Sequence, residues 1–161
     1  MKKTFYAYHV VTERPMRLGQ HILFDGARHS GVYERVMAKR DIVDDIYKNP
    51  RKYQDEALEY PVVVALRELA LEEVRREKYP DYPSRMGCLY VSETLRESQN
   101  WADYFISLGR PTFQIVKVKV TGSRFVGDAA KCFDGSPRRD ENLLLAEKYW
   151  ENGPNPPEEP P

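Results

Sequence analysis

The stretch from Met86 to Leu108 constrains the fold most, because a strand pattern passes into a helix pattern within a few residues (MGCLYVSETLRESQNWADYFISL). Residues 86–92 are apolar and rich in strand formers, which predicts a short interior strand. Thr94 and Glu97 have the spacing of a capping box, which predicts a helix start at this point. Apolar residues then recur at helical spacing, at Leu95, Trp101, Ala102, Phe105 and Ile106, before Gly109 and Pro111 end the pattern. We interpret Trp101 and Phe105 as core residues of this helix.

The rest of the chain supplies further strands and helices in an irregular order. Alternating or apolar runs predict strands at residues 5–11, 18–24, 112–120 and 124–128, and helical spacing predicts helices at 33–48, 61–78 and 141–150. Helices cluster early and do not alternate with strands, so the predicted class is α+β rather than a doubly wound sheet. In the long second helix, acidic and basic residues are interleaved, which predicts a solvated face at Arg67, Glu68, Glu72, Glu73, Arg75 and Arg76.

Composition limits the classes of function. The 161 residues fit one domain at 1–151, followed by a Pro-rich stretch at 152–161 that we expect to be an extended tail. Lys and Arg together number 25, as do Asp and Glu, so no net charge favours nucleic acid or an anionic membrane. There is no apolar run near 18 residues and no signal-peptide pattern, and we expect a cytoplasmic protein that contacts no membrane. Two cysteines without a CxxC or Cys/His pairing predict reduced thiols and no metal site.

Three segments, in this order, resemble part of a known superfamily. They are YHVVT at residues 8–12, CLYVS at 88–92 followed by NWA at 100–102, and IVKVKV at 115–120 followed by Gly127 and Asp128. Together they resemble the first two-thirds of a compact ADP-ribosyltransferase-like fold, and residues 8–150 are similar to a bacterial family of unknown function grouped with that superfamily. The resemblance implies a split β-sheet with helices packed on it, and NAD as co-substrate.

The resemblance also implies roles for particular residues. His9 with Thr12 would bind the adenosine ribose of NAD, and Tyr90 and Ser92 would contact its nicotinamide end. The pyrophosphate needs a cation, for which Arg14 after the first strand is a near candidate, together with Arg17 and His21. Each residue also has a plainer interpretation, as a structural histidine, a core aromatic or a turn residue.

The superfamily places a Glu at the start of a late strand, where it bonds the nicotinamide ribose. Here the last predicted helix is followed only by the Pro-rich stretch. Three alternatives follow: the acid is Glu141, Glu147, Glu158 or Glu159, further strands lie beyond residue 161, or no transferase chemistry exists. The resemblance implies an NAD-dependent ADP-ribosyltransferase that modifies a protein or nucleic acid as a toxin-like or defence effector. The alternative is a non-catalytic binding module that keeps the fold and recognises a nucleotide or protein partner.

Overall fold

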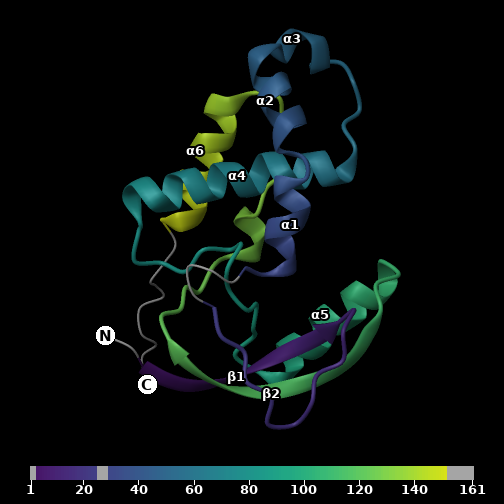
Figure 1. Cartoon of the computed structure of the whole chain (residues 1–161), viewed down its shortest axis with the longest axis vertical. Helices are drawn as coiled ribbons and strands as arrows, with labels where there is room; N and C mark the ends of the chain where they lie inside the picture. The colour runs from purple at the N-terminus through teal and green to yellow at the C-terminus, as the bar shows by residue number, and fades with distance from the viewer. Residues whose placement is uncertain (1–2, 25–28, 152–161) are drawn as a thin grey trace. The chain divides into compact units, whose positions relative to one another are not determined.

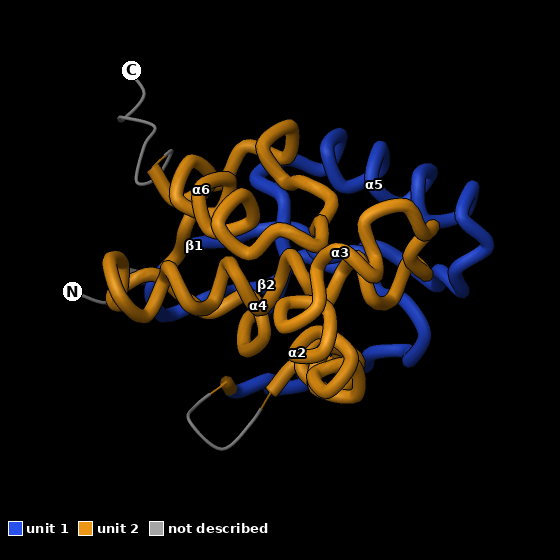
Figure 2. The backbone as a smooth tube through the Cα atoms, turned by 90° about the horizontal axis from the view of Figure 1, so that it is seen from above, with its two compact units in different colours: residues 1–23, 89–123 blue, residues 24–88, 124–161 orange. Residues whose placement is uncertain are grey.

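The computed structural model describes residues 3–24 and 29–151, and the chain forms two compact units (Figure 2). Residues 1–23 and 89–123 form the first, which we name the sheet unit; residues 24–88 and 124–161 form the second, the helical unit. Within the described residues the structure combines helices with a two-stranded antiparallel sheet, which confirms the predicted α+β class.

The sheet unit is built on two long strands that are far apart in the sequence. Strand β1 (Lys3–Thr12) pairs antiparallel with β2 (Thr112–Gly122), and the register runs from Lys3 opposite Gly122 to Thr12 opposite Thr112. One register shift lies between Val11 and Thr12. Helix α5 (Leu95–Ser107) packs against both strands (Figure 1). A two-stranded sheet is marginal by itself, so the packed helix contributes to the stability of this unit.

The cap of α5 is confirmed, but its apolar side is more exposed than predicted. The Thr94 hydroxyl accepts from the Glu97 amide at 3.1 Å and donates to the Glu97 carboxylate at 3.1 Å. The only buried residue of the helix is Ser98, whereas Trp101 is 42% and Ile106 58% exposed. Trp101 is therefore not the core residue that helical spacing predicted, since spacing gives a face but not what covers that face.

Three predicted short strands are absent. Residues 18–24 contain a turn at Leu18 and Gly19 and no strand, and residues 124–128 have no regular structure. Residues 86–92 form a single bridge, at Ser92, rather than an interior strand.

Two of these errors have a common physical cause, which is that strand-forming residues need a neighbouring strand with which to pair. Met86 is buried in a cluster of helical side chains, and its carbonyl accepts from the Ser30 amide at 3.0 Å. Phe125 packs against Tyr82, Tyr149 and Trp150 instead of extending the hairpin. Apolar β-formers therefore serve a helical core at both places.

In the helical unit, the shorter helices pack around one long helix. Its elements are α1 (Gly31–Met37), α2 (Arg40–Lys48), α3 (Pro50–Tyr53), α4 (Tyr60–Lys78), the 3₁₀ helix η1 (Ala129–Lys131) and α6 (Arg139–Trp150). Helix α4 contacts α1, α2 and α6 (Figure 1). The predicted helix at 33–48 is broken into α1 and α2 at Ala38 and Lys39, while the predicted helices α4 and α6 are confirmed.

Two apolar clusters lie along α4. The first consists of Val36, Val43, Ile46, Tyr53, Val62, Ala65, Leu66 and Met86. The second consists of Ala70, Leu71, Val74, Ala146, Tyr149 and Trp150, and the Trp150 indole donates to the Leu71 carbonyl at 2.9 Å. The chain approaches α4 so closely at Gly135 that a Cβ there would lie 2.4 Å from the Leu66 Cβ. The position therefore requires glycine.

Glu68 of α4 is buried, which corrects the predicted solvated face. Its side chain accepts from Arg67 at 3.0 Å and from Arg85 at 2.8 and 3.0 Å, and the residue is only 2% exposed. Burial alone raises the pKa of the Glu68 carboxyl, but the charges and hydrogen bonds of Arg85 and Arg67 outweigh burial and lower this pKa below 4.5. On the next turn, Glu72 accepts from Arg75, Arg76 and Ser84.

We predict that Glu68→Gln destabilises the protein by about 3–5 kcal/mol, because two guanidinium groups lose their buried counter-charge. Glu73→Gln on the same helix is the matched control. Glu73 pairs with Arg139 at an exposed site, where such a pair contributes about 1 kcal/mol or less. Urea unfolding of both variants measures the difference, and equal free energies of unfolding would contradict the prediction.

The same network predicts a pH dependence of stability. The pKa values of Glu68 and Glu72 are lowered in the folded protein, so the unfolded chain binds protons at a pH where the folded chain does not. The two ionised carboxylates therefore contribute fully to the free energy of unfolding above about pH 4.5, and this contribution is lost as the pH falls below that value. The urea concentration at the unfolding midpoint, measured from pH 7 to pH 3, should decrease less in Glu68→Gln than in the wild type.

Candidate functional site

Strand β1 positions the histidine that the sequence analysis assigned to NAD binding. Side chains alternate between the two faces of a strand, so His9 shares a face with Ala7 and Val11. Both neighbours are buried, whereas His9 is half-buried. The ring therefore lies at the margin of a packed surface, held by a paired strand and not by a loop.

The His9 ring is joined to the segment before α5. Its Nδ1 lies 2.8 Å from the Tyr90 carbonyl oxygen, 81 residues away in the sequence. A carbonyl oxygen can only accept, so Nδ1 carries the proton in this bond, and a neutral ring then presents Nε2 as an acceptor. The contact determines both the orientation of the imidazole and its tautomer.

Ser92 is held against the same strand by its backbone. The Tyr8 amide donates to the Ser92 carbonyl at 2.9 Å, and the Ser92 amide donates to the Tyr8 carbonyl at 2.8 Å. This pair anchors residues 90–92 beside β1, while the Tyr90 side chain stays 45% exposed. The structure thus brings His9, Tyr90 and Ser92 together, although they do not lie on two full strands as predicted.

A second cluster lies at the end of β1, around Arg110. The Arg110 guanidinium donates to the Thr12 hydroxyl at 3.1 Å and lies 3.6 Å from the Glu13 carboxylate. It also stands 4.4 Å from the centre of the Phe105 ring, which is a cation–π distance. Thr12 is three residues beyond His9, roughly 10 Å along a strand. Its hydroxyl binds Arg110 and does not share the His9 contact.

Glu13 adopts a backbone conformation that is uncommon for its residue type. Its φ is 67°, in the left-handed region that favours glycine. Its amide donates to the Pro111 carbonyl at 2.9 Å, so the reversal at the end of β1 is tied to the start of β2. Non-glycine residues held in this region often mark functional positions.

The remaining predicted residues are Arg14 and the four candidate acids. Arg14 follows the bend and is exposed. Glu141 is exposed on α6, and Glu147 on the same helix pairs with Lys78 at 2.9 Å, so neither stands at the start of a strand. Glu158 and Glu159 lie outside the described residues.

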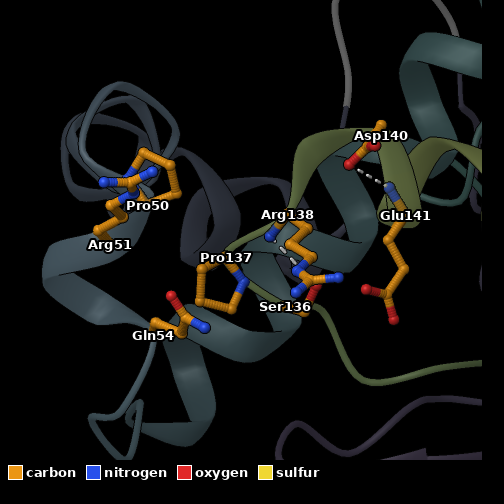
Figure 3. Close-up of a pocket in the computed structure, with 8 residues that line it drawn as sticks. All are labelled: Pro50, Arg51, Gln54, Ser136, Pro137, Arg138, Asp140 and Glu141. Atoms are coloured by element: carbon orange, nitrogen blue, oxygen red, sulfur yellow. Dashed lines mark hydrogen bonds between the residues drawn. The ribbon is translucent and has the colours of Figure 1, made fainter.

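A surface recess of about 450 Å³ lies within the helical unit, between α3 and the start of α6 (Figure 3). It is lined by Pro50, Arg51, Gln54, Ser136, Pro137, Arg138, Asp140 and Glu141. Its four charged residues are exposed and two are of each sign, so the recess does not select one class of ligand. Of the residues predicted for catalysis, Glu141 is in its wall.

Metal-binding clusters and membrane-spanning helices are both absent from residues 3–24 and 29–151. Within those ranges no group of three or more His, Cys, Asp or Glu residues could hold a metal ion. None of the helices described there is long and apolar enough to cross a membrane. Burial raises the pKa of the Cys88 thiol to about 11, although the charge of Arg85 opposes this, so Cys88 is protonated at neutral pH and unsuited to nucleophilic attack.

Sequence reasoning missed Arg110 and Glu13 at the end of β1. Arg110 stands alone between Gly109 and Pro111, in a segment that was interpreted as a helix stop. A charged residue between two backbone-breaking residues is a weak signal, because many loops have the same composition. The contact with Thr12 depends on strand pairing 98 residues away.

One family matches the chain over most of its length. It is described as "Protein of unknown function (DUF2441)", and its model matches residues 7–159. The chain therefore belongs to this family. None of the curated proteins with which the chain was compared matches it.

The His9 contact predicts a local change in backbone stability. In His9→Ala, the Tyr90 carbonyl loses a hydrogen bond of about 0.5–1.5 kcal/mol, and the Ser92 amide should exchange with deuterium about two- to tenfold faster. His21→Ala is the control, since His21 is exposed in the same unit. Hydrogen-exchange mass spectrometry of the peptide spanning residues 89–94 provides the measurement. An unchanged rate in His9→Ala would show that the contact does not hold this segment.

Proposed function

We propose that this member of a family of unknown function binds NAD through its sheet unit, as an ADP-ribosyltransferase-like protein. The observation that supports the proposal is the hydrogen bond between His9 and the Tyr90 carbonyl. It joins two positions, 81 residues apart, that the resemblance assigns to contacts with NAD. Neither position by itself distinguishes a ligand contact from an ordinary structural residue.

The imidazole suits a ribose hydroxyl. Because Nδ1 donates to a carbonyl, a neutral ring offers Nε2 as an acceptor of fixed direction. A ribose hydroxyl can donate to that nitrogen. The half-buried position of His9 reduces competition by water and strengthens such a bond.

The nicotinamide ring and the pyrophosphate of NAD have candidate partners in the same unit. The Tyr90 ring is 45% exposed and presents an aromatic surface on which a nicotinamide ring can stack. Ser92 is held beside it by the pair with Tyr8. Arg14 is exposed after the end of β1 and would supply positive charge for the pyrophosphate.

The transferase reaction requires a carboxylate in addition to these groups. The bond between ribose C1′ and the nicotinamide nitrogen breaks, nicotinamide leaves with the electron pair, and a nucleophilic atom of the target bonds to C1′ as it loses its proton. A carboxylate stabilises the positive charge that develops on the sugar and accepts that proton. Glu141, Glu147, Glu158 and Glu159 stay the proposed acids on the basis of the resemblance.

A binding module without transferase activity is the second proposal, and one observation favours it. Glu141 and Glu147 lie on α6 and not at the start of a strand, and Glu147 already pairs with Lys78. An acid in such a position differs from the arrangement that the resemblance implies. The chain would then recognise NAD or a related nucleotide without breaking it.

Isothermal titration calorimetry with NAD tests the proposal, and His9→Asn is the informative variant. The Asn side-chain amide can replace Nδ1 as donor to the Tyr90 carbonyl but has no counterpart of Nε2. We expect wild type to bind NAD and His9→Asn to bind it about three- to tenfold more weakly, the loss of one hydrogen bond. His29→Asn, at an exposed histidine of the helical unit, is the matched control and should bind like the wild type.

A nicotinamide-release assay then separates the two proposals. Release of nicotinamide by the wild type supports a transferase, whereas binding without release supports the binding module. Absence of NAD binding, or equal binding by His9→Asn and wild type, would contradict the assignment of this site.

A further inference from the structure

The neutral net charge of the chain conceals an opposite charge on each of its two units. The sheet unit contains eight Lys and Arg residues against four Asp and Glu, a net charge of +4. The helical unit contains seventeen against twenty-one, a net charge of −4. A basic unit attracts anionic partners even when the whole chain has no net charge. The balanced charge of the whole chain is therefore no guide to the partners of the sheet unit, whose own charge is positive.

Two of these basic residues stand beside tyrosines on one face of the sheet. The register places Tyr6 opposite Lys119 and Tyr8 opposite Lys117, and alternation along each strand puts all four side chains on the same face. We name this surface, made of Tyr6, Tyr8, Lys117 and Lys119, the Tyr–Lys face. At its end, the hydroxyls of Thr4 and Thr121 are hydrogen-bonded at 3.1 Å.

The Tyr–Lys face is open to solvent. Tyr6 is 59% exposed, both lysines are exposed and Tyr8 is half-buried. The Lys117 ammonium lies 5.1 Å from the centre of the Tyr6 ring, within cation–π range. A large exposed aromatic ring with two cations beside it costs solvation and charge repulsion, and an anionic ligand with flat rings would relieve both.

We infer that the Tyr–Lys face binds single-stranded nucleic acid. Lysine ammonium groups neutralise backbone phosphates, and tyrosine rings offer stacking surfaces to bases of any sequence. Paired strands keep the rings and the cations in a fixed arrangement, which reduces the entropy lost on binding. An acidic peptide would use the lysines but would have no flat group for Tyr6, so nucleic acid fits the surface better.

This surface is distinct from the proposed NAD site. His9 and Tyr8 are adjacent on β1 and their side chains therefore point to opposite faces of the sheet. Substitutions on the Tyr–Lys face leave the His9 contact with Tyr90 in place. Nucleic-acid binding and NAD binding can thus be measured separately. Either the inference or the proposed function can be contradicted without affecting the other.

Fluorescence anisotropy with labelled oligo-dT and oligo-U, using the full chain at low ionic strength, tests the inference. The wild type should bind at least one of the two, with affinity that decreases as salt increases. In Lys117→Gln/Lys119→Gln, the slope of log K against log salt should be smaller by about 1.4, since each single-strand phosphate contact contributes about 0.7. Lys48→Gln/Lys148→Gln, two exposed lysines of the helical unit, is the matched control and should keep the wild-type slope.

Tyr6 separates stacking from simple charge attraction. Tyr6→Leu keeps an apolar side chain but removes the flat ring, and we expect about tenfold weaker binding, within the range of one base–aromatic stack. Tyr6→Phe keeps the ring and should bind within about twofold of the wild type. Tyr60→Leu, at a residue that is 70% exposed in the helical unit, is the control.

Three results would overturn the inference. The first is no binding of either oligonucleotide by the wild type at low salt. The second is an unchanged salt slope in the double-lysine variant. The third is equal binding by Tyr6→Leu and wild type together with full competition by poly-glutamate of the same length, which would identify a general anion surface.

Discussion

The antiparallel pairing of β1 with β2 is the constraint on which both proposed surfaces depend. It joins residues that are at least 100 positions apart in the sequence, and its register decides which side chains become neighbours. One face of β1 carries His9, and the other carries Tyr6 and Tyr8 beside two lysines of β2. A shift of one residue in the pairing would exchange these faces and disperse both groups. The bend at Glu13 and the contacts of Arg110 stabilise the end of the ladder where the register changes.

The helical unit is organised by a different interaction, the burial of charge along α4. Glu68 is almost fully buried and compensated by Arg67 and Arg85, and Arg85 also donates to the Tyr149 hydroxyl at 2.8 Å. The network therefore links α4 to α6 through Arg85, which lies in the segment that follows α4. A buried ion pair of this type stabilises little compared with apolar residues, but it penalises arrangements in which a partner is missing. We interpret the network as structural, since Glu68 accepts from two arginines and the Cys88 thiol beside it is protonated.

Local patterns predicted more of the fold than of the site. The strands at 5–11 and 112–120 and the helices α4, α5 and α6 follow from spacing, caps and breakers within a few residues. Residues 86–92 have strand composition, yet Met86 is buried among helices and only Ser92 pairs with β1. The family resemblance assigned His9 and Tyr90 to one NAD molecule, but the direct contact between them was not predicted. Arg110 escaped prediction because its partners Thr12 and Glu13 lie almost a hundred residues away.

The sequence by itself determined the helices α4, α5 and α6, the two alternating strands, and the family to which the chain belongs. These features depend on hydrogen bonds and side-chain spacing within a few positions, or on similarity along the whole chain. Only the tertiary structure decided that Glu68 is buried, that Trp101 is exposed, and that the sheet unit has a net positive charge. Burial and surface charge depend on which distant segments meet, and no local pattern specifies those partners.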